Sequence, residues 1–138
     1  MTEDNLIIVD TDMFSKDPPA KTAEANIVAK KYGISDKDLA EVEDYKKELT
    51  EHNAWDLPFM GYVNEDGYGY AYVPDQAITE TGRNAHKAFR ALPHDVQTAF
   101  ALRMLFTHRD TDHYGADMFL HYERGFNVRF EGAGSNNY

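Results

Sequence analysis

The segment AKKYGISDKDLAEVEDY, residues 29–45, carries the signals of two helices joined by a tight turn. Gly33 suits the left-handed backbone conformation that ends a helix. Ser35 and Asp38, three residues apart, form the capping box that begins the next helix. Apolar side chains recur at helical spacing on both sides of these caps. The segment therefore predicts an N-terminal helical hairpin.

Further helices and short strands are expected on both sides of this hairpin. Apolar residues point in nearly every direction around residues 93–106, a pattern typical of a central, buried helix. The expected elements are a strand at 5–9, helices at 20–32, 35–52, 80–92, 93–106 and 111–124, a β-hairpin at 59–73 and a strand at 126–130. They predict an α+β fold, a mainly α-helical single domain over residues 1–138 with a small antiparallel β-sheet or hairpin. A short flexible tail is expected from about 131 to 138.

The composition limits the functions open to this chain. The 138 residues are 42% hydrophobic and include no cysteine, which excludes disulfides and thiolate metal ligands. The first residues lack the basic stretch and apolar run of a signal peptide, and no segment is long and apolar enough to span a bilayer. We therefore expect a soluble, cytoplasmic protein.

Negative charge gathers in the first part of the chain. The formal net charge is −10, and residues 1–56 carry 14 acids against seven lysines. Seven of these acids, against three lysines, fall within residues 36–52, the second helix of the hairpin. Such a surface repels nucleic acid and anionic membranes and favours a basic protein partner. Pairs such as Glu43 and Lys47, four residues apart, also fit a solvated helix face laced with ion pairs.

The spacing of the hairpin resembles that of the helix-turn-helix DNA-binding motif. Ala29 lies four residues before the turn glycine, Gly33, and Leu39 takes a buried position of the second helix. By this resemblance, the residues that would enter the major groove are Ser35, Asp36, Lys37 and Glu41. The acids of this helix would repel DNA phosphates, so a mimic of nucleic acid that occupies a partner's basic groove is an alternative to a DNA reader.

A second cluster, FTHRDTDHYGADMFLH at residues 106–121, combines histidines with aspartates. These are the ligand types that Zn, Mn or Fe sites use where no cysteine is available. The stretch THRDTDHYG is similar to the His-x-His-x-Asp-His-x-Gly signature of the metallo-β-lactamase fold, with Asp110 in place of the second histidine. The resemblance implies a metal-dependent hydrolase, whose ligands would be His108 and Asp110 for one metal, and Asp112 and His113 for another. Alternatively, the two aspartates cap the start of a helix.

Two further groups of residues have both a functional and a structural interpretation. Tyr68, Tyr70 and Tyr72 line one face of the expected β-hairpin, where they either bind a partner or pack across strands. Asp10 and Asp12 follow the first strand, either as paired carboxylates for magnesium or as acids that end a strand in a turn.

These observations favour a non-enzymatic acidic module for protein interaction or assembly. Its partner would be a basic, nucleic-acid-handling protein. For this chain itself we expect no cofactor, no membrane and no direct contact with nucleic acid. A homo-oligomer stays open. The expected partner-binding residues are Asp36, Asp38, Glu41, Asp44, Glu48, Tyr68, Tyr70 and Tyr72. The first alternative is a hydrolase that uses Zn, Mn or Fe at the cluster from His108 to His121, and the second is a helix-turn-helix DNA-binding regulator.

Overall fold

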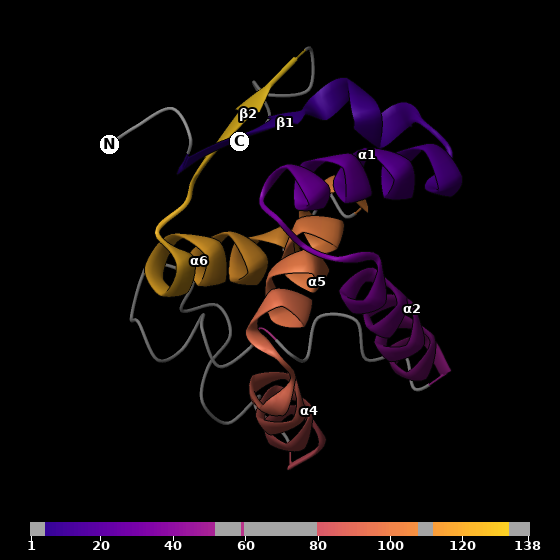
Figure 1. Cartoon of the computed structure of the whole chain (residues 1–138), viewed down its shortest axis with the longest axis vertical. Coiled ribbons are helices and arrows are strands. Elements are labelled where there is room, and N and C mark those ends of the chain that lie inside the picture. The colour runs from indigo at the N-terminus through magenta and orange to yellow at the C-terminus, as the bar shows by residue number, and fades with distance from the viewer. Residues whose placement is uncertain (1–4, 52–58, 60–79, 108–111, 133–138) are drawn as a thin grey trace.

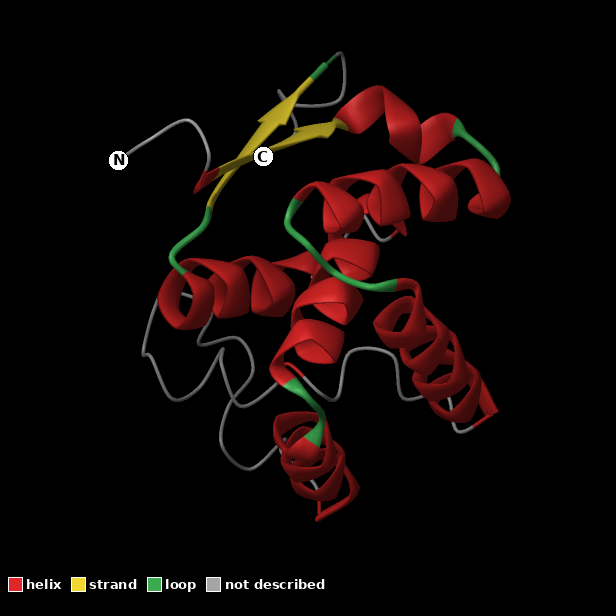
Figure 2. Cartoon of the chain, in the orientation of Figure 1, coloured by secondary structure: helices red, strands yellow, loops and turns green. Residues whose placement is uncertain are grey.

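The computed structural model describes residues 5–51, 59, 80–107 and 112–132 (Figure 1). Helices make up most of this part of the chain, and two short strands complete it (Figure 2). In chain order the elements are β1 (Leu6–Asp10), the 3-10 helix η2 (Thr11–Ser15), α1 (Pro18–Lys31), α2 (Asp36–Glu51), α4 (Glu80–Ala91), α5 (His94–Thr107), α6 (Asp112–Arg124) and β2 (Asn127–Glu131). The β-hairpin expected at 59–73 lies outside the described residues, apart from Phe59.

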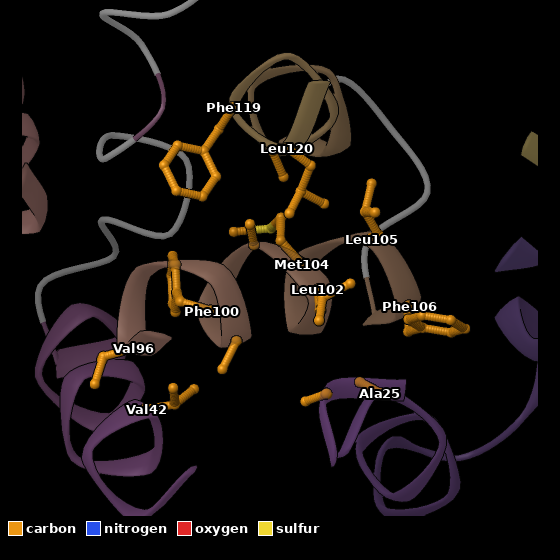
Figure 3. Packing of buried hydrophobic residues seen from close by; sticks show 14 of the residues in the cluster. Ala25, Val42, Val96, Phe100, Leu102, Met104, Leu105, Phe106, Phe119 and Leu120 are labelled. Atoms are coloured by element: carbon orange, nitrogen blue, oxygen red, sulfur yellow. The ribbon is translucent and has the colours of Figure 1, made fainter. Parts of the chain in front are cut away.

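Helix α5 lies at the centre of the described helices, with α1, α2 and α6 packed around it (Figure 1). Every residue from Val96 to Phe106 is buried, so the prediction of a central helix is confirmed. In Figure 3, the side chains of α5 point toward Phe119 and Leu120 of α6 on one side and toward α1 and α2 on the other. Neither α5 nor any other helix among the described residues is long and apolar enough to cross a membrane.

A cluster of aromatic rings holds α4 against the rest of the helices. Phe89 of α4 is fully buried, and its ring centre lies 5.8 Å from that of Phe100 on α5. The ring of Tyr45 on α2 lies 5.0 Å from the same Phe100 ring, at an edge-on angle. Phe59 contacts Phe89, Phe100 and Phe119, at centre distances of 5.0, 5.6 and 6.4 Å. Aromatic pairs at these distances add about 0.5–1.5 kcal/mol each beyond the burial of their surface.

The prediction of an antiparallel sheet is wrong for the described residues, in which the sheet is a parallel pair of strands. β1 pairs with β2 in the register Leu6 with Asn127 through Asp10 with Glu131. The two strands lie at opposite ends of the described chain, with all of the helices between them (Figure 1). Parallel strands need such a crossover connection, whereas the turns of adjacent hairpins produce antiparallel pairs. β2 runs to Glu131, the first residue of the expected tail.

Helix α1 packs on α5 through small residues rather than through its largest apolar side chains. Ala25 and Ala29 are buried, whereas Ile27 is 64% exposed. The apolar spacing of the sequence predicts a buried stripe that includes Ile27 and Val28. Val28 packs against the core, whereas the expectation for Ile27 is wrong. Because alanine side chains are short, the backbone of α1 comes close to α5. The side chain of Asn26 on α1 therefore reaches Arg103 of α5.

The caps predicted for the helical hairpin are confirmed. Gly33 has φ of 85°, and the backbone N–H of Ile34 donates to the carbonyl of Ala29 at 3.2 Å, which closes the end of α1. At the start of α2, the backbone N–H of Asp38 donates to the Ser35 hydroxyl at 3.2 Å. The same hydroxyl donates to the Asp38 carboxylate at 3.0 Å. These local bonds set the direction in which α2 leaves α1.

Candidate functional site

The two acids in the first turn of α2 are engaged by the fold. Asp36 forms an ion pair with Lys30 of α1, with 2.9 Å between Oδ1 and Nζ. Asp38 accepts the hydrogen bond from the Ser35 hydroxyl. Both carboxylates also face the positive end of the helix dipole, where negative charge is favoured. Their first role is therefore to fix the start of α2.

A third acid of α2, Glu43, pairs with an arginine from the centre of the molecule. Arg103 of α5 is only 1% exposed, and its Nη1 lies 2.5 Å from Glu43 Oε1. Its Nη2 donates to Asn26 Oδ1 of α1 at 2.9 Å. The guanidinium thus joins α1, α2 and α5. The sequence predicts a Glu43 pair with Lys47 instead, and no such ion pair forms in the described structure.

The remaining four acids of α2 lie along one side of the helix and are named here the acidic stripe. They are Glu41, Asp44, Glu48 and Glu51. Their spacing of three, four and three residues places them on one face over about 15 Å of helix. All are exposed except Glu41, which is half-buried. None of them forms an ion pair with a basic side chain in the described part of the chain.

Two lysines accompany the stripe without neutralising it. Lys37, one turn before Glu41, and Lys47, three residues after Asp44, are both exposed. Neither lies within ion-pair distance of an acid among the described residues. The stripe therefore carries four negative charges that no ion pair with another described residue neutralises.

Tyr45 lies at the border between the acidic stripe and the buried face of α2. Its ring packs between Phe89 and Phe100, and the residue is 8% exposed. The hydroxyl is closed to water and has no hydrogen-bond partner among the described residues. Burial raises the pKa of the phenol above its ordinary value, and the charge of Glu48 raises that pKa further. The phenol is therefore a neutral group beside a carboxylate.

The residues expected to bind a partner divide into three groups. Glu41, Asp44 and Glu48 lie together on the acidic stripe. Asp36 and Asp38 lie on the same helix but serve its first turn. The tyrosines Tyr68, Tyr70 and Tyr72 lie outside the described residues.

Sequence reasoning missed two members of this region. Glu51 continues the stripe by its spacing of three from Glu48, a signal visible in the sequence. Tyr45 occupies an apolar position of α2, and only the three-dimensional packing shows that its hydroxyl is buried and forms no hydrogen bond with the described residues.

The predicted metal ligands fall at the edge of the described chain. His108 and Asp110 lie outside the described residues, and so do the side chains of Asp112 and His113. Helix α6 begins at Asp112, in agreement with the helix start expected there. Among the described residues, no three or more histidines and acids come together as metal ligands would.

One member of that histidine and aspartate cluster has an altered acidity. Asp117 is half-buried on α6, and burial raises the pKa of its carboxyl to about 6. The nearby His121, one turn later, acts in the opposite direction and lowers it. Asp117 therefore changes charge close to neutral pH.

The acids that follow β1 stabilise a turn. Asp10 Oδ1 accepts from the backbone N–H of Asp12 at 2.9 Å, which caps the 3-10 helix η2. The Thr11 hydroxyl donates to the carbonyl of Glu131 at 2.9 Å. Gly132 has φ of 116°, and a Cβ on it would come within 2.7 Å of Thr11 Oγ1. These contacts fasten the end of β2 to the turn, as expected for acids that end a strand.

Comparison of the chain with models of known protein families, with curated proteins and with solved structures gave no match.

Proposed function

We propose that this protein is a non-enzymatic interaction module whose acidic stripe binds a basic protein partner. The observation that supports this most directly is the row of four carboxylates on α2 that form no ion pair with described residues. Like charges one helical turn apart destabilise a helix by about 0.2–0.5 kcal/mol per pair. A cationic partner removes this repulsion when it binds.

The charge of the whole chain supports the same class of partner. The net charge of −10 repels nucleic acid and anionic lipid over the distance at which charges act in salt solution, about 10 Å at 0.1 M ionic strength. A protein with a basic surface is drawn to it, including one whose basic surface otherwise holds nucleic acid. The lack of cysteine suits the reducing cytoplasm, where we place this encounter.

The stripe is also mounted on a fixed helix. The opposite border of α2 is tied by Glu43 to Arg103, and its apolar face is buried through Leu39, Val42 and Leu49. A helix fixed in this way loses little conformational freedom on binding, so more of the electrostatic attraction appears as affinity.

The test measures binding of fluorescent poly-lysine at a series of salt concentrations. The double variant Asp44→Lys, Glu48→Lys should weaken binding by at least about tenfold at low salt, because it replaces two attractions by two repulsions. The double variant Glu24→Lys, Asp95→Lys makes the same change of net charge away from the stripe and serves as the matched control.

The two variants separate a specific surface from a general charge effect. The proposal requires the stripe variant to lose more than the control, with affinity that falls as salt rises. Equal losses in the two variants would mean that only net charge matters and would refute the stripe as a binding site.

A further inference from the structure

The outer face of strand β1 exposes a large apolar side chain. Ile7 and Val9 are buried in the core, whereas Ile8 between them points outward and is 44% exposed. The only charged residue of β1 is its last one, Asp10. Natural proteins usually protect an open strand with a lysine, a proline or a bulge within it. β1 carries none of these and pairs with β2 in an uninterrupted register.

One edge of β1 is available to a further strand. β1 pairs with β2, and no other strand in the described part of the chain lies beside it. An edge strand offers a row of backbone N–H and C=O groups, to which a strand from another chain can add. The sheet lies at the opposite end of the described elements from α4, away from the acidic stripe on α2 (Figure 1). The apolar character of β1 and its open edge together indicate an interface.

The sequence of β1 is complementary to itself when a second copy runs antiparallel. Paired residues of an antiparallel sheet lie on the same face, so a symmetric pair of strands keeps its buried and exposed faces only if it is centred on a residue. Centring on Ile8 pairs all five residues of each strand: Ile8 with Ile8 of the second copy, Leu6 with Asp10, and Ile7 with Val9. Each exposed isoleucine is then covered by the other.

The charges at the two ends of β1 favour the same arrangement. At its start, the Tyr32 hydroxyl donates to the Leu6 carbonyl at 3.0 Å, and Nζ of Lys31 lies 5.7 Å from the centre of the Tyr32 ring. Lys31 forms no ion pair with the residues described. At its end, Asp10 is exposed. An antiparallel second strand brings its Asp10 toward Lys31 twice by symmetry, whereas a parallel strand brings lysine toward lysine.

We propose that the partner of the β1 edge is a second copy of this chain, and that two β1 strands pair antiparallel about Ile8 in a symmetric dimer. The two sheets then join into one sheet of four strands, in the order β2, β1, β1, β2. This interface goes beyond the proposed function and leaves the acidic stripe of each copy available. Because each copy has a net charge of −10, salt should strengthen the dimer by screening the repulsion, whereas it weakens binding of a basic partner.

The first test is sedimentation velocity of the full chain over a series of concentrations and salt concentrations. The native chain should dimerise, and Ile8→Lys should weaken the dimer by about tenfold or more, because two like charges then lie directly opposite each other. Ile27→Lys is the matched control. It makes the same change at the other exposed isoleucine, which lies on α1 and is 64% exposed. The control should leave the dimer unchanged.

The second test determines the register by oxidation of single cysteine variants. The chain contains no cysteine, so an introduced thiol can crosslink only to its counterpart in another copy. In Ile8→Cys the two Cα atoms should lie about 4.5–5.5 Å apart, within reach of a disulfide. In Leu6→Cys they should lie about 14 Å apart, which is too far. Ile8→Cys should therefore form the crosslinked dimer and Leu6→Cys should not.

Three results would overturn the proposal. The native chain could stay monomeric at every concentration and salt concentration, or Ile8→Lys could dimerise as well as Ile27→Lys does. Equal crosslinking of Leu6→Cys and Ile8→Cys would indicate a parallel pair or random collisions instead of the antiparallel register. None of these results bears on the proposed function, which is measured by the binding of poly-lysine to the acidic stripe.

Discussion

A buried polar group lies at each border of the buried face of α2, and the two groups differ in the partners that they contact. On one border, the Arg103 guanidinium is surrounded by the core but meets Glu43 of α2 and Asn26 of α1. On the other border, the Tyr45 hydroxyl is equally withdrawn from water and forms no hydrogen bond with described residues. The charge of Arg103 is thus paired within the chain, whereas the Tyr45 hydroxyl forms no hydrogen bond with the residues that the structure describes.

The difference follows from what each group costs when buried. An unpaired charge loses several kcal/mol of hydration even after the protein relaxes, so Arg103 is stable in the core only with a carboxylate beside it. A neutral hydroxyl without a partner costs about 1–3 kcal/mol, which a well-packed aromatic ring can offset. A fold can therefore tolerate a buried phenol without a hydrogen bond, where it cannot tolerate a buried guanidinium charge without a carboxylate.

The largest expected effect comes from breaking the ion pair between Glu43 and Arg103. Glu43→Ala leaves the Arg103 charge in the core without its carboxylate, and the free energy of unfolding should fall by about 2–3 kcal/mol. This is below the full value for a buried pair, because the Glu43 side chain is 55% exposed and water reaches it. Urea unfolding followed by circular dichroism measures the change.

The lysine that the sequence pairs with Glu43 provides the control. Lys47→Ala should change the free energy of unfolding by no more than about 0.5 kcal/mol, since Lys47 forms no ion pair among the described residues. Equal losses for Glu43→Ala and Lys47→Ala would contradict the assignment of Glu43 to Arg103.

Asp117 extends the comparison to a third buried polar group. It is a half-buried carboxyl that forms no hydrogen bond with described residues. Its pKa is raised to about 6, so the folded chain holds this proton more tightly than the unfolded chain does. The stabilisation is fully present below about pH 4 and is lost as pH rises through 6. Above pH 7, Asp117→Asn should therefore raise the free energy of unfolding by about 1–2 kcal/mol, after allowance for partial exposure.

The measurement is urea unfolding of the native chain and of Asp117→Asn at pH 5 and pH 8. The two proteins should differ more at pH 8 than at pH 5, since the native carboxyl is largely protonated at the lower value. A difference that is the same at both pH values would show that the substitution acts through packing rather than through charge.

Local signals in the sequence predicted the helices because these signals act over a few residues. Gly33 and Ser35 specify an end and a start of a helix by their own backbone chemistry, and both caps are confirmed. The pairing of β1 with β2 has no such signal, since the strands meet across all the helices of the described chain. The wrong antiparallel sheet came from reading strand pairing as a local property.

The candidate site, like the fold, could be predicted from the sequence only where the signal is local. The acids of the stripe follow from helical spacing, and Glu41, Asp44 and Glu48 were expected from it. Which acids the fold uses internally depends on a distant residue, Arg103, whose sequence signal is a lone charge within an apolar helix. The exposure of Ile27 escaped prediction for a similar reason, because the face of α1 that the other elements bury carries Ala25 and Ala29 rather than Ile27.

The smallest expected effect concerns the border of α2 that carries Tyr45, in the protein without a partner. Tyr45→Phe removes a buried hydroxyl that forms no hydrogen bond in the described part of the chain, so the free energy of unfolding should rise by about 0.5–1 kcal/mol. Tyr32→Phe should lower it by a similar amount, because the Tyr32 hydroxyl donates to the Leu6 carbonyl at 3.0 Å. Thermal and urea unfolding of the two variants gives both values. A loss of stability in Tyr45→Phe would mean that the hydroxyl is already satisfied in solution, and the two borders of α2 would then be alike.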